Sequence, residues 1–294
     1  MVKIMTNIFD TIIIGGGPAG VQAGIYLVRA NKKVLLIHKS GIGSLAKANQ
    51  IENFYGIFGA SGKDVYLTGI NQVKSLGASV FDEEVSSVSH DYENNLFEVS
   101  AGGKEFHSKS LILAMGKEQK TNSDFMINVN QGVSYCALCD GFFYKNKKVA
   151  VIGESEFAFA EFKHLLDVTD DVTLLLNAKA HNILPKYIRN NEESKIVEIK
   201  NGENRNVKVV FDDARSQEFD GVFIAEGSIG ASAITKLLGL TKTNDGHIVV
   251  DEKMQTNING VFACGDINGT PYQIAKAVSD GMKAGLSVIN YLNK

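Results

Sequence analysis

A short apolar strand, a glycine-rich turn and a helix follow one another in the segment FDTIIIGGGPAG near the start of the chain. Gly15, Gly17 and Gly20 give the spacing G-x-G-x-x-G between that strand and that helix. The first glycine permits a tight turn, the second lets a pyrophosphate approach the backbone, and the third lets helix and strand pack closely. The helix N-terminus adds partial positive charge. The turn therefore predicts a dinucleotide-binding unit.

The residues after this turn predict a βαβ unit and a parallel sheet. The helix PAGVQAGIYLVRAN should bury a stripe formed by Val21, Ile25 and Val28, and KKVLLIHKS should return as a second buried strand. One expected feature is missing. An acidic residue that holds a ribose usually follows about 20 residues after the glycines. Here the strand ends at Ile37, His38 and Lys39, so the adenosine end of a ligand must be held in another way.

A second unit of the same kind opens at KKVAVIG, residues 147–153, and the pattern then predicts a helix near 156–167 and strands at 171–177, 206–211 and 220–226. Residues 84–116 predict a β-meander. The segment NGVFACGD predicts a late strand, and the helix after it should bury Ile274, Val278, Met282 and Leu286. The fold class is therefore α/β, with two Rossmann-like, doubly wound, three-layer domains and a β-meander.

Composition narrows the class of protein. The length of 294 residues fits two domains, and 44% hydrophobic with 21% charged residues is a normal globular mixture. A formal net charge of −3 gives no footprint for nucleic acid. The run Ile12–Ile14 is too short for a signal peptide or a membrane span. Three cysteines without a secretory signal favour a cytoplasmic protein.

Two of those cysteines, Cys136 and Cys139, form a C-x-x-C pair that Asp140 follows directly. Such a pair can close a small disulfide or hold one thiolate, and the carboxyl group can donate or accept the proton. The alternative is half of a zinc site. A structural zinc ion needs two more ligands, whereas the only other cysteine is Cys264 and the six histidines form no close pair. We therefore expect a redox pair and no metal.

Taken together, GGGPAG, CALCDG and FACGD resemble the low-molecular-weight thioredoxin reductases, two-domain flavoprotein disulfide reductases, over essentially the whole chain. The resemblance implies FAD as cofactor, thioredoxin as substrate and a homodimer. It implies that Cys139 faces the flavin, that Cys136 attacks the thioredoxin disulfide, and that Asp140 manages the protons. It assigns to the FAD site Gly15, Gly17, Pro18, Ala19, Gly20, Gly43, Asn53, Gly116, Gly265, Asp266 and Gln273, and we add Tyr272 on the basis of its residue type.

The same resemblance implies the domain order. Because FAD-binding motifs come from both ends of the chain, residues 1–117 and 246–294 would form the FAD domain, and residues 118–245 would be an inserted NAD(P)-binding-like domain with the cysteine pair. The last helix, from near Gln273, would aim its positive end at the flavin. Tyr272 stands where the family has Arg, so its ring could stack on the flavin, although ordinary packing is an equal alternative.

The second turn, GESEFAFAE, departs from the family's NADPH site. Ser155 replaces the central glycine, Glu154 and Glu156 add negative charge, and the usual His-Arg-Arg run reads Leu176, Asn177, Ala178. A later arginine position reads Asn182, and the usual G-H-x-P reads Gly227–Gly230. No guanidinium remains there for a 2′-phosphate. The pattern resembles the ferredoxin-dependent flavin thioredoxin reductases, and it predicts ferredoxin as the electron donor.

Three further interpretations stay open at the level of the sequence. The chain could be a thioredoxin reductase that uses NADH or NADPH through an atypical site, or a diflavin disulfide oxidoreductase with a second flavin in the vacated domain. It could also be a flavin-bearing redox sensor without turnover. A basic face for ferredoxin is expected, and Lys145, Lys147 and Lys148 form a cluster, but a solvated loop explains them equally well.

Overall fold

The computed structural model describes residues 8–41, 43–46, 48–116, 126–129, 131–134, 137–179, 184–225 and 231–294. The chain divides into two compact units, one formed by residues 1–118 with 234–294 and the other by residues 119–233. The second boundary thus lies earlier in the chain than the expected residue 245. Hydrogen bonds from Thr241 N to Asn257 Oδ1 (2.9 Å) and from Val249 N to Thr241 O (2.9 Å) tie the intervening segment to the first unit.

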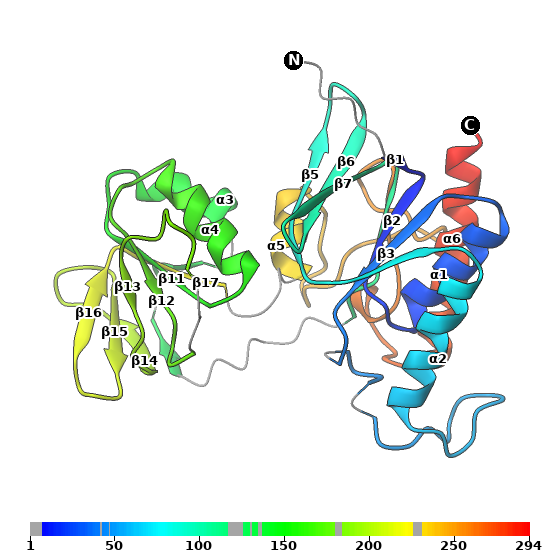
Figure 1. Ribbon diagram of the computed structural model, residues 1–294, viewed down its shortest axis with the longest axis horizontal. Helices are drawn as coiled ribbons and strands as arrows, with labels where there is room; N and C mark the ends of the chain where they lie inside the picture. The colour runs from blue at the N-terminus through cyan, green and yellow to red at the C-terminus, as the bar shows by residue number, and fades with distance from the viewer. Residues whose placement is uncertain are drawn as a thin grey trace. The chain divides into compact units, whose positions relative to one another are not determined.

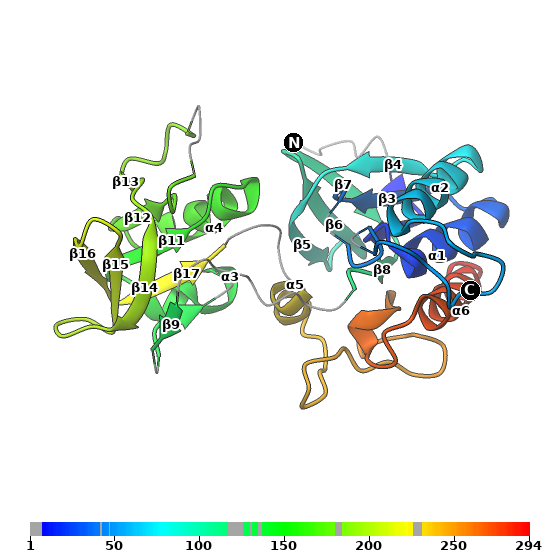
Figure 2. The same cartoon turned by 90° about the horizontal axis from the view of Figure 1, so that it is seen from below.

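The first unit is built around a five-stranded parallel sheet whose strand order is β18-β8-β2-β3-β4. Figure 1 and Figure 2 show that helices cover one side of this sheet and that an antiparallel meander lies on the other. The strands are β18 (Val261–Ala263), β8 (Leu111–Leu113), β2 (Thr11–Ile14), β3 (Val34–His38) and β4 (Ser79–Asp82). The helices are α1 (Pro18–Arg29), α2 (Gly62–Ser75) and α6 (Ile274–Leu292).

Small residues, rather than the large apolar ones that we expected, form the contact between α1 and α6. A Cβ atom added to Gly281 would lie 2.2 Å from Ala19 O, and one added to Gly285 would lie 3.0 Å from Ala23 O. The buried faces of α1 and α6 therefore differ from the apolar stripes that the sequence predicted. Ile25 and Val28 are only half-buried, and Leu286 is 44% exposed. The periodicity of large side chains misses this face because two helices that pack so closely need glycine and alanine.

The meander forms the sheet β1-β7-β6-β5, in which β5, β6 and β7 are antiparallel and β1 joins β7 in parallel. These strands are β1 (Ile8–Phe9), β5 (Val85–Asp91), β6 (Leu96–Ala101) and β7 (Lys104–Ser108). The apolar strand at the end of residues 84–116 does not belong to the meander, because the chain turns after Ser108 and β8 then enters the parallel sheet. Ser108 Oγ donates to Ser110 O at 2.8 Å and holds this turn.

The second unit repeats the plan with the parallel sheet β10-β17-β11-β12-β13 and the smaller sheet β16-β15-β14-β9. Helix α4 (Glu156–Leu166) lies on one side of the parallel sheet and β14–β16 lie on the other (Figure 1). The parallel strands are β10 (Val133–Ser134), β17 (Gly221–Ile224), β11 (Val149–Ile152), β12 (Val172–Leu175) and β13 (Asn191–Glu192). The smaller sheet contains β16 (Ser216–Phe219), β15 (Val207–Phe211), β14 (Ile196–Asn201) and β9 (Met126–Asn128).

Short helices complete the fold. They are α3 (Ala137–Asp140), the 3₁₀ turn η1 (Gly141–Tyr144), α5 (Ala231–Leu237) and the 3₁₀ turn η2 (Asp266–Asn268). Both units have the doubly wound α/β architecture that the sequence predicts. None of the helices in the described parts of the chain has the length and apolar character needed to span a membrane.

Candidate active site

The first glycine turn joins β2 to α1 and leaves its centre open. Gly15 has φ +113°, and a Cβ atom on it would lie 2.3 Å from Ala114 O, so the turn requires glycine there. Gly20 is equally constrained, because an added Cβ would lie 2.0 Å from Gly15 O. Gly17 differs from both: nothing lies within 4 Å of its Cβ position, and no side chain caps the helix that starts after it. The open turn and uncapped amides suit a pyrophosphate.

The late Gly-Asp turn lies directly against this loop. A Cβ atom on Gly265, which has φ +84°, would lie 2.9 Å from Ala19 Cβ, and Asp266 begins η2 immediately after it. Lys276 holds the turn from α6, since its ammonium group donates to Gly265 O at 2.7 Å and to Gly269 O at 2.8 Å. Two predicted FAD motifs from opposite ends of the chain therefore meet.

A third pair of predicted residues meets at the start of α6. Asn53 Nδ2 donates to Gln273 Oε1 at 3.0 Å, although 220 positions separate the two residues in the sequence. Gln273 is the N-cap residue of α6, and its side chain leaves the first amides of that helix uncapped. Next to it, Tyr272 Oη lies 2.7 Å from His247 Nε2. The tyrosine ring therefore has a fixed partner at the edge of the expected flavin site.

The remaining predicted FAD residues lie on loops of the same unit. Gly116, with φ +76°, follows β8, and Gly43 follows β3; nothing lies within 4 Å of the Cβ position of either residue. Pro18 occupies the first turn of α1, where its missing N–H costs nothing.

The second turn has the same backbone shape but is closed. Gly153 has φ +148°, and a Cβ atom on it would lie 2.4 Å from Ala225 O. The Cβ position of Gly15 is similarly close to Ala114 O. Ser155, however, is the N-cap residue of α4, and its Oγ accepts the N–H of Ala158 at 3.3 Å. In an open turn the backbone amide at the position of Ala158 would be free to bind a phosphate, but here it is already bonded to Ser155. Phe157, Phe159 and Phe162 are buried in the core beneath it.

Charges around the second turn are paired within the protein. Lys179, on the loop after β12, forms an ion pair of 3.1 Å with Glu154 of the turn. The two arginine positions of the family read Asn177 and Ala178 in this chain. Asn177 is buried, and its Oδ1 accepts the N–H of Ile196 at 2.8 Å, whereas Ala178 is exposed. The side chain of Glu156, Asn182 and the segment 227–230 lie outside the described residues.

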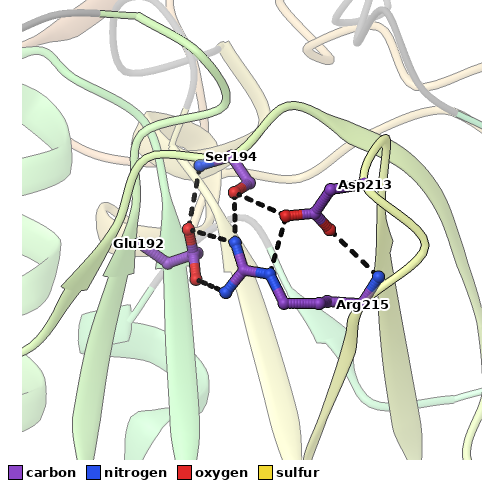
Figure 3. Close-up of polar contacts among 4 residues, drawn as sticks. All are labelled: Glu192, Ser194, Asp213 and Arg215. Atoms are coloured by element: carbon purple, nitrogen blue, oxygen red, sulfur yellow. Dashed lines mark hydrogen bonds and ion pairs between the residues drawn. The ribbon is translucent and has the colours of Figure 1, made fainter.

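The guanidinium group of Arg215, near the end of β13, is also bonded within the protein. Arg215 donates to Asp213 Oδ2 at 2.6 Å and to Glu192 Oε2 at 3.0 Å, and Ser194 lies between the two carboxylates (Figure 3). These bonds lower the pKa of Asp213, whereas the pKa of Glu192 is lowered first by the backbone N–H of Ser194 and then by Arg215. The cluster is satisfied without a ligand.

The redox motif lies on α3 and the residues before it. Cys136 and the side chain of Cys139 lie outside the described residues. Asp140, which follows Cys139, accepts a hydrogen bond from Ser134 Oγ at 2.7 Å. The carboxylate of Glu161 on α4 accepts the N–H of Ala137, the first residue of α3. The pKa of Glu161 is raised to about 7, chiefly by burial and also by the negative charge of Asp140, while the hydrogen bond from Ala137 acts in the opposite direction.

Cys264 is a packing residue. It is fully buried among the helices and sheet of the first unit, and burial raises the pKa of its thiol far above the usual range. A thiol of this kind is unreactive.

Known proteins resemble the chain along its whole length. The pyridine nucleotide-disulphide oxidoreductase family model matches residues 9–281. A thioredoxin reductase from Bacillus subtilis is 33% identical, over 98% of this chain and 96% of that protein. The atypical thioredoxin reductase TRi from Desulfovibrio vulgaris Hildenborough has a TM-score of 0.85 at 30% identity, covering 97% and 98% of the two chains. A ferredoxin-flavin thioredoxin reductase from Clostridium acetobutylicum has a TM-score of 0.70 at 30% identity, with the same coverage.

The chain belongs to the pyridine nucleotide-disulphide oxidoreductases, flavoproteins that act on a disulfide. Within them it is a member of the low-molecular-weight thioredoxin reductase family. Its cofactor is FAD, and the open turn around Gly17 fits the pyrophosphate of that cofactor.

Several residues around the sites had no sequence signal that we recognised. Lys276 and Glu161 look like surface residues of amphipathic helices, yet both are largely buried and hydrogen-bonded. Tyr66 and His38 also pair across the first unit, with 2.6 Å between Tyr66 Oη and His38 Nδ1. A charged or polar residue on the buried face of its helix would have been the signal for Glu161.

Proposed function

We propose that this protein is a thioredoxin reductase that receives electrons from reduced ferredoxin rather than from NADPH. The coarser function, an FAD-dependent oxidoreductase acting on a disulfide, is that of its family. The finer proposal rests mainly on one observation: Ser155 caps α4 at the point where an NADPH pyrophosphate would need free amides. The ion pair between Glu154 and Lys179 places further side chains at the same turn.

The chemistry of the cofactor is compatible with such a donor. FAD, when bound, accepts electrons singly and delivers them in pairs. Reduction of the disulfide of Cys136 and Cys139 to two thiols consumes two electrons and two protons. We assign one proton to Asp140, whose carboxyl group Ser134 holds at 2.7 Å. Cys139 would exchange electrons with the flavin, and Cys136 would attack the disulfide of thioredoxin. These roles follow the resemblance of CALCD to the family motif.

Two exposed aromatic residues support docking of a protein substrate next to the redox motif. Phe142 and Phe143 follow α3 in η1 and are 74% and 64% exposed. Exposed aromatic side chains of this kind commonly anchor protein partners. We propose that thioredoxin contacts them and that the protein is a homodimer, as the family resemblance suggests. Light scattering of the purified protein tests the dimer.

The electron donor is tested by anaerobic titration. The purified flavoprotein is mixed with reduced ferredoxin and, separately, with NADPH and NADH, while the flavin absorbance is followed. We expect ferredoxin to bleach the flavin and neither nucleotide to do so rapidly. Fast bleaching by micromolar NADPH would contradict the proposal and support the atypical nucleotide-dependent enzyme.

Two simpler measurements test whether the protein is a diflavin enzyme or a redox sensor. Release of FAD by denaturation should give one flavin per chain, and two would support a diflavin enzyme. Reduction of thioredoxin with reduced ferredoxin should proceed through many turnovers. Absence of turnover with an intact flavin would support a redox sensor instead.

A further inference from the structure

The carboxyl end of β3 lacks the residue that usually recognises the adenosine of a dinucleotide. In Rossmann folds an acidic side chain at this position bonds the ribose 2′-hydroxyl. Here β3 ends at His38. Because β3 lies next to β2 in the sheet, His38 stands beside the open turn that suits the pyrophosphate of FAD.

The imidazole of His38 is held in place from two sides. The residue is only 7% exposed, and a Cβ atom added to Gly16 would lie 2.8 Å from His38 Cβ, so it packs directly on the glycine turn. On the other side, Tyr66 from α2 places its Oη 2.6 Å from Nδ1, and the two rings meet edge to face. A buried histidine with one nitrogen fixed in this way presents the other, Nε2, in a defined direction.

The electrostatics keep this imidazole neutral. Burial lowers the pKa of His38, and the charge of Asp82 acts in the opposite direction more weakly. Burial also raises the pKa of Tyr66, so its hydroxyl group keeps its proton. A neutral imidazole bonded at Nδ1 has one remaining hydrogen-bonding atom, Nε2. A ribose hydroxyl both donates and accepts, so it is complementary to Nε2 in either tautomer.

Asp82 is the residue opposite His38 in the register of β3 and β4, and it carries a carboxylate. Its two oxygens are already engaged by Ser40, whose backbone N–H donates to Oδ1 at 2.9 Å and whose hydroxyl donates to Oδ2. These bonds lower the pKa of Asp82 against the effect of burial. Asp82 therefore fixes the loop after β3, and it remains the competing candidate for the ribose.

We propose that His38 takes the place of the missing acid and recognises the adenosine ribose of FAD through Nε2, with Tyr66 as its positioning residue. The inference rests on FAD being the cofactor and is independent of the electron donor. It makes the histidine a determinant of affinity for FAD over flavins without the ribose hydroxyl. If reduced ferredoxin did not reduce the flavin, the proposal for His38 would therefore still stand.

The test compares two ligands on the flavin-free protein. Binding of FAD and of its 2′-deoxyadenosine analogue is followed by the quenching of flavin fluorescence, for the natural protein and for H38A, H38Q, Y66F and D82N. The natural protein should bind FAD about threefold to tenfold more tightly than the analogue, the range for a neutral hydrogen bond. H38A should bind the two ligands equally, and Y66F should fall between, because its imidazole loses its fixed orientation. H38Q should retain part of the preference, since its amide can reach a similar position.

The ratio of the two affinities separates recognition from damage to the fold, because a poorly folded variant loses both ligands alike. Undiminished preference for FAD in H38A would overturn the proposal. So would equal binding by the natural protein, or a preference that disappears in D82N and persists in H38A.

Discussion

Ser155 Oγ accepts the N–H of Ala158 at 3.3 Å and so closes the second glycine turn, whereas the equivalent helix of the first unit begins at Gly17 without a side-chain cap. The two turns share their backbone geometry, with Gly15 and Gly153 both at positive φ against a carbonyl oxygen. The strand–turn–helix element thus occurs twice in this chain. In the first copy the helix amides are free to bind a pyrophosphate, and in the second a serine side chain caps them.

The glycines of the first turn should respond differently to alanine. G17A should fold normally, because nothing lies within 4 Å of the new Cβ and the backbone there is extended, but it should lose most of its FAD. G20A should instead destabilise the protein by several kcal/mol, because its Cβ would lie 2.0 Å from Gly15 O. Flavin content and urea unfolding of both variants measure this. Equal flavin loss with equal instability in the two would contradict it.

The cap of α4 should contribute to stability rather than to ligand binding. We expect S155A to lower the free energy of unfolding of the second unit by about 1 kcal/mol, the usual effect of removing a serine cap. S61A is the matched control, since Ser61 caps α2 in the first unit by accepting the N–H of Asp64 at 3.1 Å. Urea unfolding detects both losses. If S155A instead left stability unchanged and altered affinity for NADPH, Ser155 would be a ligand-binding residue.

The contact between Asn53 and Gln273 should matter to the cofactor more than to the fold. Their hydrogen bond is exposed, so N53A should change the unfolding temperature little. Gln273 would lose its partner at the start of α6, and we expect FAD affinity to fall severalfold and the visible absorption of the bound flavin to shift. An unchanged flavin spectrum together with full affinity would place this pair outside the cofactor site.

Glu161 should make the stability of the second unit depend on pH. Its pKa is raised to about 7 from the ordinary 4.5, so the folded state binds the proton more tightly than the unfolded state. The resulting stabilisation is complete below about pH 4.5 and is lost as the pH rises through 7. E161Q, which cannot ionise, should therefore gain stability relative to the natural protein between pH 5 and pH 8, approaching about 3 kcal/mol. Urea unfolding at both pH values measures the difference, and E203Q, at an exposed site, should show none.

The assigned order of the thiols is tested by C136S. This variant should still accept electrons at the flavin from the donor, and it should lose turnover with thioredoxin. C139S is the paired variant, and it should block transfer from the flavin to the thiols. Turnover that survives in C136S would remove the role assigned to Cys136.

Much of the fold was predictable because strand–glycine–helix patterns mark both Rossmann-like units, and the α/β class is confirmed. The helix faces were not. Ile274 and Leu286 suggested a buried stripe on α6, whereas the buried face is built from Ala277, Gly281 and Ala284. Periodicity weights large apolar side chains, and it cannot detect a contact that depends on their absence.

The candidate site divides in the same way. Motif residues such as Gly17 and Asn53 could be assigned by resemblance, and the structure brings the first turn near Gly265 and Asn53 near Gln273. Partners that depend on tertiary packing could not be read from the sequence. Lys179 with Glu154 and Tyr66 with His38 are 25 and 28 positions apart, and no local spacing rule links them.

The close contact of Gly281 with Ala19 has a consequence for how the holoprotein forms. The first glycine turn is synthesised well before α6, the helix that packs against it. The flavin pocket cannot be completed until α6 has been synthesised, so stable cofactor loading must follow translation of that helix. Loss of α6 alone would leave the sequence of the pyrophosphate loop unchanged but would remove the helix that supports it.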